Sequence, residues 1–139
     1  MRDENCIFCK IANGDIPSDT IYEDDNFRVI LDLSPASKGH ALILPKTHAS
    51  NLFDLDEETS AKVLRVAKKV GRAMQEALCC DGINIVQNNG EAAGQTVMHF
   101  HVHIIPRYKG EKQIVAWEPK QSVPEEQKII AEKIKSAML

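Results

Sequence analysis

Three histidines separated by single apolar residues constrain the fold of this chain more than any other feature: His99-Phe100-His101-Val102-His103. Successive side chains of an extended strand point to opposite faces, so a strand over residues 97–105 gathers the imidazoles on one face. The residues on the other face are uniformly apolar: Met98, Phe100, Val102 and Ile104. We therefore expect this apolar row to pack in the core beneath a helix, and the histidine row to face a cleft, a metal ion or solvent.

Three interpretations of the histidine row compete: a polar strand face, a single metal site, or a division of labour among the imidazoles. Alternate residues of a strand are about 6.7 Å apart, so the outer two histidines are separated by roughly 13 Å at the backbone. Because zinc holds every ligand nitrogen at about 2.0–2.1 Å, one ion cannot bind all three on a straight strand. We favour the third interpretation, in which one ring nitrogen of His101 attacks phosphorus while the other donates its proton to a backbone carbonyl.

The segment Gly94-Gln95-Thr96 lies directly before the histidine row. It offers an unencumbered backbone, an amide and a hydroxyl, which can hold phosphate oxygens and protonate a leaving group. On its own such a segment is more often an ordinary turn. Its position beside His99 is what makes it a candidate phosphate-binding loop.

The composition is that of one ordinary globular domain. The chain has 139 residues, 43% of them apolar and 27% charged, which excludes disorder and low complexity. The net charge of −3 argues against a nucleic-acid polymer as partner. No apolar run approaches ~18 residues and the N-terminus has no hydrophobic signal region, so we expect a cytoplasmic protein without a membrane partner.

Hydrophobic periodicity and turn residues predict an α+β fold for residues 1–139. The longest helix is expected over residues 56–78, where apolar residues recur at helical spacing after a possible capping box at Asp54 and Glu57. About five strands form an antiparallel sheet that this helix covers, the last of them halted at Pro106. The expected strands span residues 20–23, 28–32, 40–44, 83–87 and 97–105, with a short helix over 6–13 and a C-terminal helical extension over about 122–138.

The pattern of residues 99–105 resembles the signature of the histidine-triad (HIT) family of nucleotide hydrolases and transferases. The overall look is that of the Hint branch, which is nucleoside phosphoramidase-like, in its bacterial-type form. The resemblance covers most of the chain: Ile16-Pro17, Tyr22-Glu23-Asp24-Asp25, Asp32-Leu33-Ser34-Pro35, Gly39-His40, Leu44-Pro45-Lys46, Asn88 and Gly94-Gln95. It implies a HIT-like fold and a homodimer whose long helices pair, although the apolar stripe of that helix is equally explained by core packing.

The resemblance also implies roles for individual residues. His101 corresponds to the nucleophile that forms a nucleotidyl-histidine intermediate, His103 to its phosphate-contacting neighbour, and His99 with His40 to a supporting pair. Asp32 corresponds to the carboxylate that binds the ribose hydroxyls, although a turn-forming Asp is the simpler interpretation. The remaining nucleotide contacts fall on Leu33, on a phosphate-side loop of Asn88, Gly94, Gln95 and Thr96, whose hydroxyl assists the leaving amine, and on base-pocket walls of Ile7, Phe8, Ile16 and Leu42.

The cysteines fall into two pairs. Cys6 and Cys9 form a C-x-x-C motif, which in a cytosolic chain is more often metal-binding or redox-active than a structural disulfide. The family resemblance supplies His48 and His99 as partners in a closed Cys₂His₂ zinc site of structural type. Two buried thiols are the alternative, and a redox role is less favoured because no thioredoxin-like context surrounds the motif. We expect the adjacent Cys79-Cys80 to be packing thiols.

The sequence thus predicts an enzyme that cleaves the α-phosphorus bond of purine nucleoside phosphoramidates or related nucleotides and releases a nucleoside monophosphate. Zinc is the expected structural metal, and no organic cofactor is expected. Two alternatives stay open: a Fhit-like dinucleoside polyphosphate hydrolase, and a zinc-stabilised nucleotide-binding regulatory module with little turnover. The tail over residues 108–139, including Trp117, departs from the short Hint ending and leaves the leaving-group preference undecided.

Overall fold

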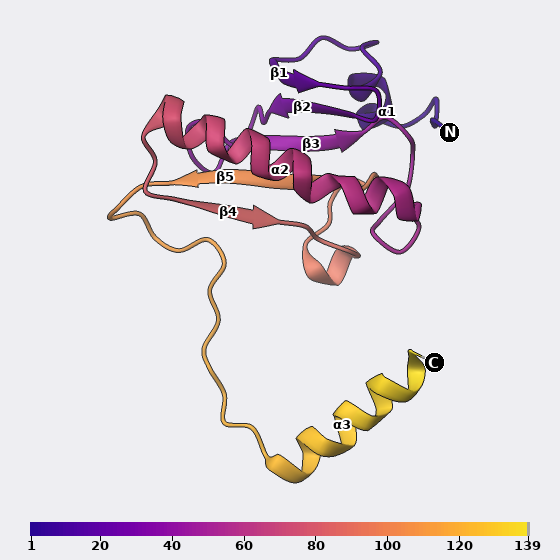
Figure 1. Ribbon diagram of the computed structural model, residues 1–139, viewed down its shortest axis with the longest axis vertical. Coiled ribbons are helices and arrows are strands. Elements are labelled where there is room, and N and C mark those ends of the chain that lie inside the picture. The colour runs from indigo at the N-terminus through magenta and orange to yellow at the C-terminus, as the bar shows by residue number, and fades with distance from the viewer. Residues whose placement is uncertain (139) are drawn as a thin grey trace.

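A computed structural model describes residues 1–138 of the chain as an α+β body with a protruding C-terminal tail (Figure 1). The strands form one antiparallel sheet in the order β1-β2-β3-β5-β4, and the long helix α2 lies across one face of it. This arrangement confirms the predicted α+β fold. The elements are α1 (Ile7–Ala12), β1 (Thr20–Glu23), β2 (Phe27–Leu31), β3 (Ala41–Pro45), α2 (Glu57–Leu78), β4 (Gly82–Val86), the 3-10 turn η1 (Glu91–Ala93), β5 (Val102–Arg107) and α3 (Pro124–Ala137).

Helix α2 is held by its apolar stripe rather than by local propensity. Each Val or Met side chain that it buries contributes about 1.5–3 kcal/mol, and together with Ala67 these side chains pack against Phe100, Val102 and Ile104 of the sheet. The stripe consists of Val63, Val66, Ala67, Val70 and Met74.

The N-terminal cap of α2 differs from the prediction. The side chain of Asp56 accepts the Thr59 N–H at 2.9 Å, which makes Asp56 the capping residue. The helix begins at Glu57, so Asp54 lies two residues before the cap, in the preceding turn, where its N–H donates to Asn51 Oδ1.

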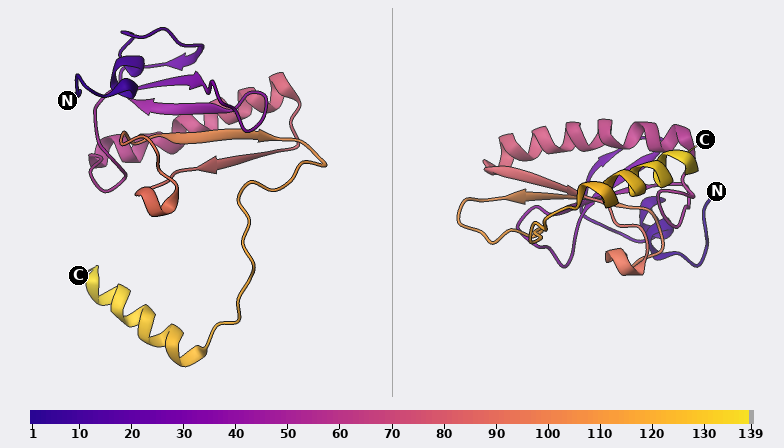
Figure 2. Two further views of the ribbon diagram at one scale, coloured as in Figure 1. Left: turned by 180° about the vertical axis from the view of Figure 1, so that it is seen from behind. Right: turned by 90° about the horizontal axis from the view of Figure 1, so that it is seen from below.

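Strand β3 is buried on both faces and separates two layers. Ala41 and Ile43 pack toward α2, whereas Leu42 and Leu44 pack with Phe8 of α1. Figure 2 (right) shows α1 beneath the sheet and α2 above it. Because His103 is the cross-strand partner of Leu42, the histidine row faces the α1 side of the sheet, away from α2.

Strand β5 is shifted relative to its predicted bounds. It begins at Val102, and its pairing with β4 runs through Pro106, opposite Ile83. Strand β3 pairs with β5 only as far as Ile104, so no carbonyl of β3 lies opposite position 106. A proline, which has no N–H to donate, is therefore tolerated there. Met98 is 48% exposed, so its predicted place in the core is wrong.

The end of α2 corrects a further expectation. Cys79 is the C-cap residue of this helix, in the left-handed conformation with φ 52°. Its side chain is exposed and that of Cys80 is only half-buried. Cys79 is therefore not a packing thiol.

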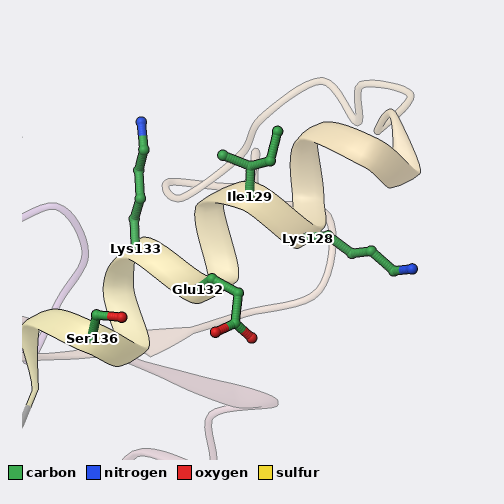
Figure 3. Close-up of a pocket in the computed structure, with 5 residues that line it drawn as sticks. All are labelled: Lys128, Ile129, Glu132, Lys133 and Ser136. Atoms are coloured by element: carbon green, nitrogen blue, oxygen red, sulfur yellow. The ribbon is translucent and has the colours of Figure 1, made fainter.

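The tail leaves the body after β5 and carries α3 away from it (Figures 1 and 2). Every residue from Lys109 to Met138 is exposed. A hollow along α3 is lined by side chains of that helix alone, as Figure 3 shows: Lys128, Ile129, Glu132, Lys133 and Ser136. It is therefore a surface feature of one helix and not a convergent site. Among residues 1–138, the structure has no helix that is long and apolar enough to span a bilayer.

Candidate active site and metal centre

Three imidazoles and one phenyl ring converge on the α1 face of the sheet. His101 directly precedes β5, His103 lies in β5, and His40 precedes β3 and lies beside them. The ring centroids of His101 and His103 are 5.1 Å apart, as are those of His103 and His40. Phe8 of α1 places its ring edge-on to His101 at 5.1 Å. Segments far apart in the sequence thus meet around His101.

His101 has one ring nitrogen tied to the backbone and one free. Its Nδ1 lies 2.6 Å from the carbonyl oxygen of His99. A carbonyl only accepts hydrogen bonds, so Nδ1 carries the proton and Nε2 carries the lone pair. The ring is 8% exposed, and this burial lowers its pKa against the opposing effect of the His99 hydrogen bond. At neutral pH His101 is therefore an uncharged imidazole with a nucleophilic nitrogen.

His103 and His40 form a hydrogen-bonded pair next to His101. His40 Nε2 lies 2.9 Å from His103 Nδ1. Burial, followed by the neighbouring His101 and His40, lowers the pKa of His103 to about 4. Burial also lowers the pKa of His40, although Asp32 opposes it. Both rings are consequently uncharged near pH 7.

Asp32 combines the two roles considered for it from the sequence. Its Oδ1 accepts the Ser34 N–H at 2.8 Å, which makes it a turn-forming residue. Its Oδ2 lies 3.6 Å from His40 Nε2, beyond hydrogen-bond length, and the side chain is only half-buried. One carboxylate oxygen therefore remains available to a ligand. The adjacent Leu33 is 92% exposed and packs against nothing in the core.

Gln95 organises the loop that precedes the histidines. Its amide nitrogen donates to the carbonyls of Ser50 (2.6 Å) and Val97 (3.0 Å), and its oxygen accepts the Gly90 N–H at 2.8 Å. Because both amide hydrogens are used within the protein, the Gln95 side chain holds the loop in this structure.

The other loop residues remain open to a ligand. The Thr96 side chain is exposed. Gly94 has φ +94°, a left-handed conformation that favours glycine, and a side chain added to it would lie 3.7 Å from the amide nitrogen of Asn88. The loop thus presents the Thr96 hydroxyl and a bare backbone beside Asn88.

The expected base-pocket walls are only partly gathered. Leu42 is buried and packs with the half-buried Phe8, under the same strands that carry the histidines. Ile16 is half-buried, whereas Ile7 is 54% exposed. Phe8 and Leu42 therefore form the apolar floor next to His101, and Ile7 lies at its margin.

Two cysteines and two histidines form a second cluster at the N-terminal end of the same strand segment. Cys6 Sγ and Cys9 Sγ each lie 3.4 Å from His99 Nδ1, and Cys9 Sγ lies 3.4 Å from His48 Nδ1. Zinc at its usual bond lengths in a tetrahedral shell separates sulfur and nitrogen ligands by about 3.5 Å. The spacing of Cys6, Cys9, His48 and His99 therefore fits a zinc ion.

The hydrogen bonds around this cluster also suit a metal. His99 is fully buried and donates from Nε2 to the Pro45 carbonyl at 3.0 Å, which leaves the Nδ1 lone pair facing the sulfurs. Backbone N–H groups of Asp3 and Cys9 donate to Cys9 Sγ (3.3 Å) and Cys6 Sγ (3.4 Å). Such donors favour thiolate ligands. Burial is the main cause that lowers the pKa of His99 to about 4, so its ring is uncharged.

His99 connects the two clusters. Its side chain belongs to the metal-binding set, and its carbonyl accepts the Nδ1 proton of His101. Sequence reasoning missed the contribution of Pro45, whose carbonyl orients His99. Backbone groups carry no residue-specific signal, so only the fold identifies them.

Comparisons with known proteins agree with this geometry. Residues 13–110 match the model of the HIT domain family. Adenosine 5'-monophosphoramidase hnt1 of Schizosaccharomyces pombe is 42% identical over 133 residues, 95% of this chain and 97% of that protein. The crystal structure of SMU.412c from Streptococcus mutans superposes with a TM-score of 0.94 at 38% identity, covering 99% of this chain and 88% of that one. A Zn-bound histidine triad family protein from Mycobacterium smegmatis has a TM-score of 0.75 at 45% identity, covering 84% of each chain.

Proposed function

Because this chain belongs to the HIT domain family, we propose that it hydrolyses or transfers nucleotidyl groups at the α-phosphorus of purine nucleoside phosphoramidates or related nucleotides. The observation that carries this proposal is the 2.6 Å hydrogen bond from His101 Nδ1 to the His99 carbonyl, which leaves the Nε2 lone pair free to attack. The name of the fission-yeast relative, an adenosine 5'-monophosphoramidase, supports the phosphoramidate as substrate class.

The proposed reaction proceeds in two displacements. His101 Nε2 forms a bond to the α-phosphorus while the bond to the amine breaks, and the amine leaves with its electron pair and a proton that solvent supplies through the exposed Thr96 hydroxyl. Water then adds its hydroxyl group to phosphorus as the bond to Nε2 breaks, its other proton returns to solvent, and a nucleoside monophosphate departs. Two inversions retain the configuration at phosphorus. The imidazolium formed in the first step is stabilised by the His99 carbonyl, which already accepts its Nδ1 proton.

The remaining contacts orient the nucleotide. The free oxygen of Asp32 binds the ribose hydroxyls, and the base lies on the apolar floor of Phe8 and Leu42. The phosphate lies between the Thr96 hydroxyl and His103. Gln95 contributes by holding the loop in place.

Zinc in this proposal is held by Cys6, Cys9, His48 and His99. A closed Cys₂His₂ shell supplies structural cross-linking and has no open position for a substrate. The site fastens the N-terminal segment to the residue whose carbonyl orients His101. The protein's own residues therefore perform the chemistry.

The same proposal includes a homodimer. Strand β4 forms one edge of the sheet, and Ile85 on it is half exposed. Leu64 on α2, the helix that the family resemblance pairs across the dimer, is also exposed, so both the helix and the free strand edge offer an apolar side chain. Size-exclusion chromatography with light scattering tests this point, because a mass of one chain at micromolar concentration contradicts the dimer.

A substrate panel tests the proposed activity. Adenosine and guanosine phosphoramidates are compared with dinucleoside polyphosphates, and zinc content is measured on the same sample. We expect turnover of the phosphoramidates, its loss in His101→Gly, and retained nucleotide binding in that variant. If dinucleoside polyphosphates are turned over faster than the phosphoramidates, the assigned substrate class is wrong and the protein is a dinucleoside polyphosphate hydrolase. Binding without turnover of any compound indicates a regulatory module. Unchanged turnover in the His101→Gly variant refutes the assignment of the nucleophile.

A further inference from the structure

We infer that the backbone N–H of Ala36, acting through His40, fixes the proton of His103 on Nε2, so that His103 presents a hydrogen-bond donor beside the lone pair of His101. Two hydrogen bonds carry this order, one from the Ala36 N–H to His40 and one between His40 and His103, and the direction of each follows from the atoms concerned.

The relay begins in the loop between β2 and β3. The Ala36 nitrogen lies 2.9 Å from His40 Nδ1. A backbone N–H can only donate, so Nδ1 of His40 is an acceptor and carries no proton. His40 is 5% exposed, and burial lowers its pKa, so the ring is neutral near pH 7. Its single proton therefore resides on Nε2.

The second link joins the two histidines. His40 Nε2 lies 2.9 Å from His103 Nδ1, whereas the nearest Asp32 oxygen is 3.6 Å away. His40 thus donates to His103, and Nδ1 of His103 is an acceptor. Because His103 is itself uncharged, its proton resides on Nε2. The Ala36 N–H is therefore sufficient to fix which ring nitrogen of His40 and which of His103 carries the proton.

A metal ion does not account for the same arrangement. Asp32, His40 and His103 also lie close enough together to be considered as ligands. However, two nitrogens bound to one tetrahedral zinc are about 3.3 Å apart, and the observed 2.9 Å is a hydrogen-bond length. The sulfur–nitrogen distances of 3.4 Å at the Cys6 and Cys9 cluster, by contrast, match metal ligation.

The consequence, which rests on the proposed function, is that adjacent imidazoles are held as opposite tautomers. The His99 carbonyl places the His101 proton on Nδ1, and the relay places the His103 proton on Nε2. A phosphate whose phosphorus faces His101 then has an oxygen next to an N–H of His103 and not next to a second lone pair. Ala36 and His40 act through His103, so they are positioning residues.

Nuclear magnetic resonance tests the relay without any substrate. Long-range ¹H–¹⁵N correlation on zinc-loaded protein with ¹⁵N-labelled histidine rings distinguishes protonated from unprotonated ring nitrogens, and single-histidine variants assign the signals. We expect protons on Nε2 of His40, Nε2 of His103 and Nδ1 of His101. A proton on Nδ1 of either His40 or His103 overturns the inference.

A matched pair of variants tests the catalytic consequence. The amide nitrogen of His40→Gln can still donate to His103 Nδ1, whereas the carboxylate of His40→Glu, of the same length, accepts and draws the proton of His103 to Nδ1. We expect the kcat of H40E to be about 100-fold below that of H40Q. This is the loss typically seen when an enzyme loses one hydrogen-bond donor to the charge that develops in the transition state. Equal kcat in the two variants, with the His103 proton moved, contradicts a catalytic role for the tautomer.

Two controls separate this effect from others. Ser34→Gln and Ser34→Glu introduce the same difference in charge on an exposed position of the same loop, and we expect their kcat values to agree within about fivefold because exposed charges are screened. Absence of nucleotide turnover in the wild type refutes the proposed function but leaves the resonance result standing. Turnover combined with the opposite tautomer of His103 refutes the relay alone.

Discussion

Acid should destabilise the fold through His103. Burial, together with the neighbouring His101 and His40, lowers the pKa of this residue to about 4, whereas an exposed histidine of the unfolded chain titrates near 6.5. Between these values the unfolded chain binds a proton that the native protein does not. The free energy of unfolding is therefore fully retained above about pH 6.5 and falls as the pH falls toward about 4.

The size of this loss follows from the two pKa values. At about pH 5 the unfolded His103 is almost fully protonated and the native residue is mostly neutral, which lowers the free energy of unfolding by about 2 kcal/mol relative to about pH 7. His103 is half-buried, so solvent screening reduces this figure only in part.

Denaturant titration at the two pH values measures this effect. His103→Gln keeps a polar side chain of similar length but does not titrate. We expect the wild type to lose about 2 kcal/mol more than H103Q between about pH 7 and about pH 5. All other titrating groups are present in both proteins, so the difference reports His103 together with its effect on the neighbouring His40 and His101. Equal losses in the two proteins would show that the ring is not held neutral by burial.

Three further changes have defined outcomes. Cys9→Ser replaces a buried thiol of the proposed zinc site, so we expect the zinc content to fall from one per chain and the Tm to drop, measured by elemental analysis and calorimetry; undiminished zinc excludes Cys9 as a ligand. Asp32→Ala should lower kcat/KM for a ribonucleotide by about 10- to 100-fold, the loss of one charged hydrogen bond, and should affect the 2'-deoxy analogue far less; equal losses contradict a ribose contact. Gly39→Ala places a Cβ 2.5 Å from Leu78 Cδ1 at a backbone φ of +93°, and we expect it to lower the free energy of unfolding by about 1–3 kcal/mol; an unchanged denaturation midpoint contradicts this packing.

The alternation of residues 99–103 predicted which side chains face the core, but not where the strand begins. Phe100, Val102 and Ile104 are buried toward α2 as expected. Residues 97–101 nevertheless lie outside β5, because the Phe100 N–H donates to the Ala49 carbonyl and not to a neighbouring strand. Side-chain periodicity reports the face that a residue presents, whereas the strand bounds depend on a hydrogen-bond partner elsewhere in the chain.

The site residues divide in a similar way. Spacing identified Cys6 and Cys9 as a pair, but His48 and His99 became candidate partners only through the family resemblance, because they lie dozens of residues away and the fold alone brings them together. The loop-holding role of Gln95 was not predicted, because a buried amide can serve a loop as well as a ligand. The Ala36 N–H could not have been found, since every residue except proline has this group.

The most direct test of His101 as the nucleophile is to trap its covalent adduct. The protein is mixed with an adenosine phosphoramidate, quenched within one turnover, and digested under conditions that preserve phosphoramidate bonds. Mass spectrometry should then locate one adenylyl group on His101, and the His101→Gly variant should carry none. An adenylyl group on another residue, or turnover at the wild-type rate in the glycine variant, would contradict the mechanism.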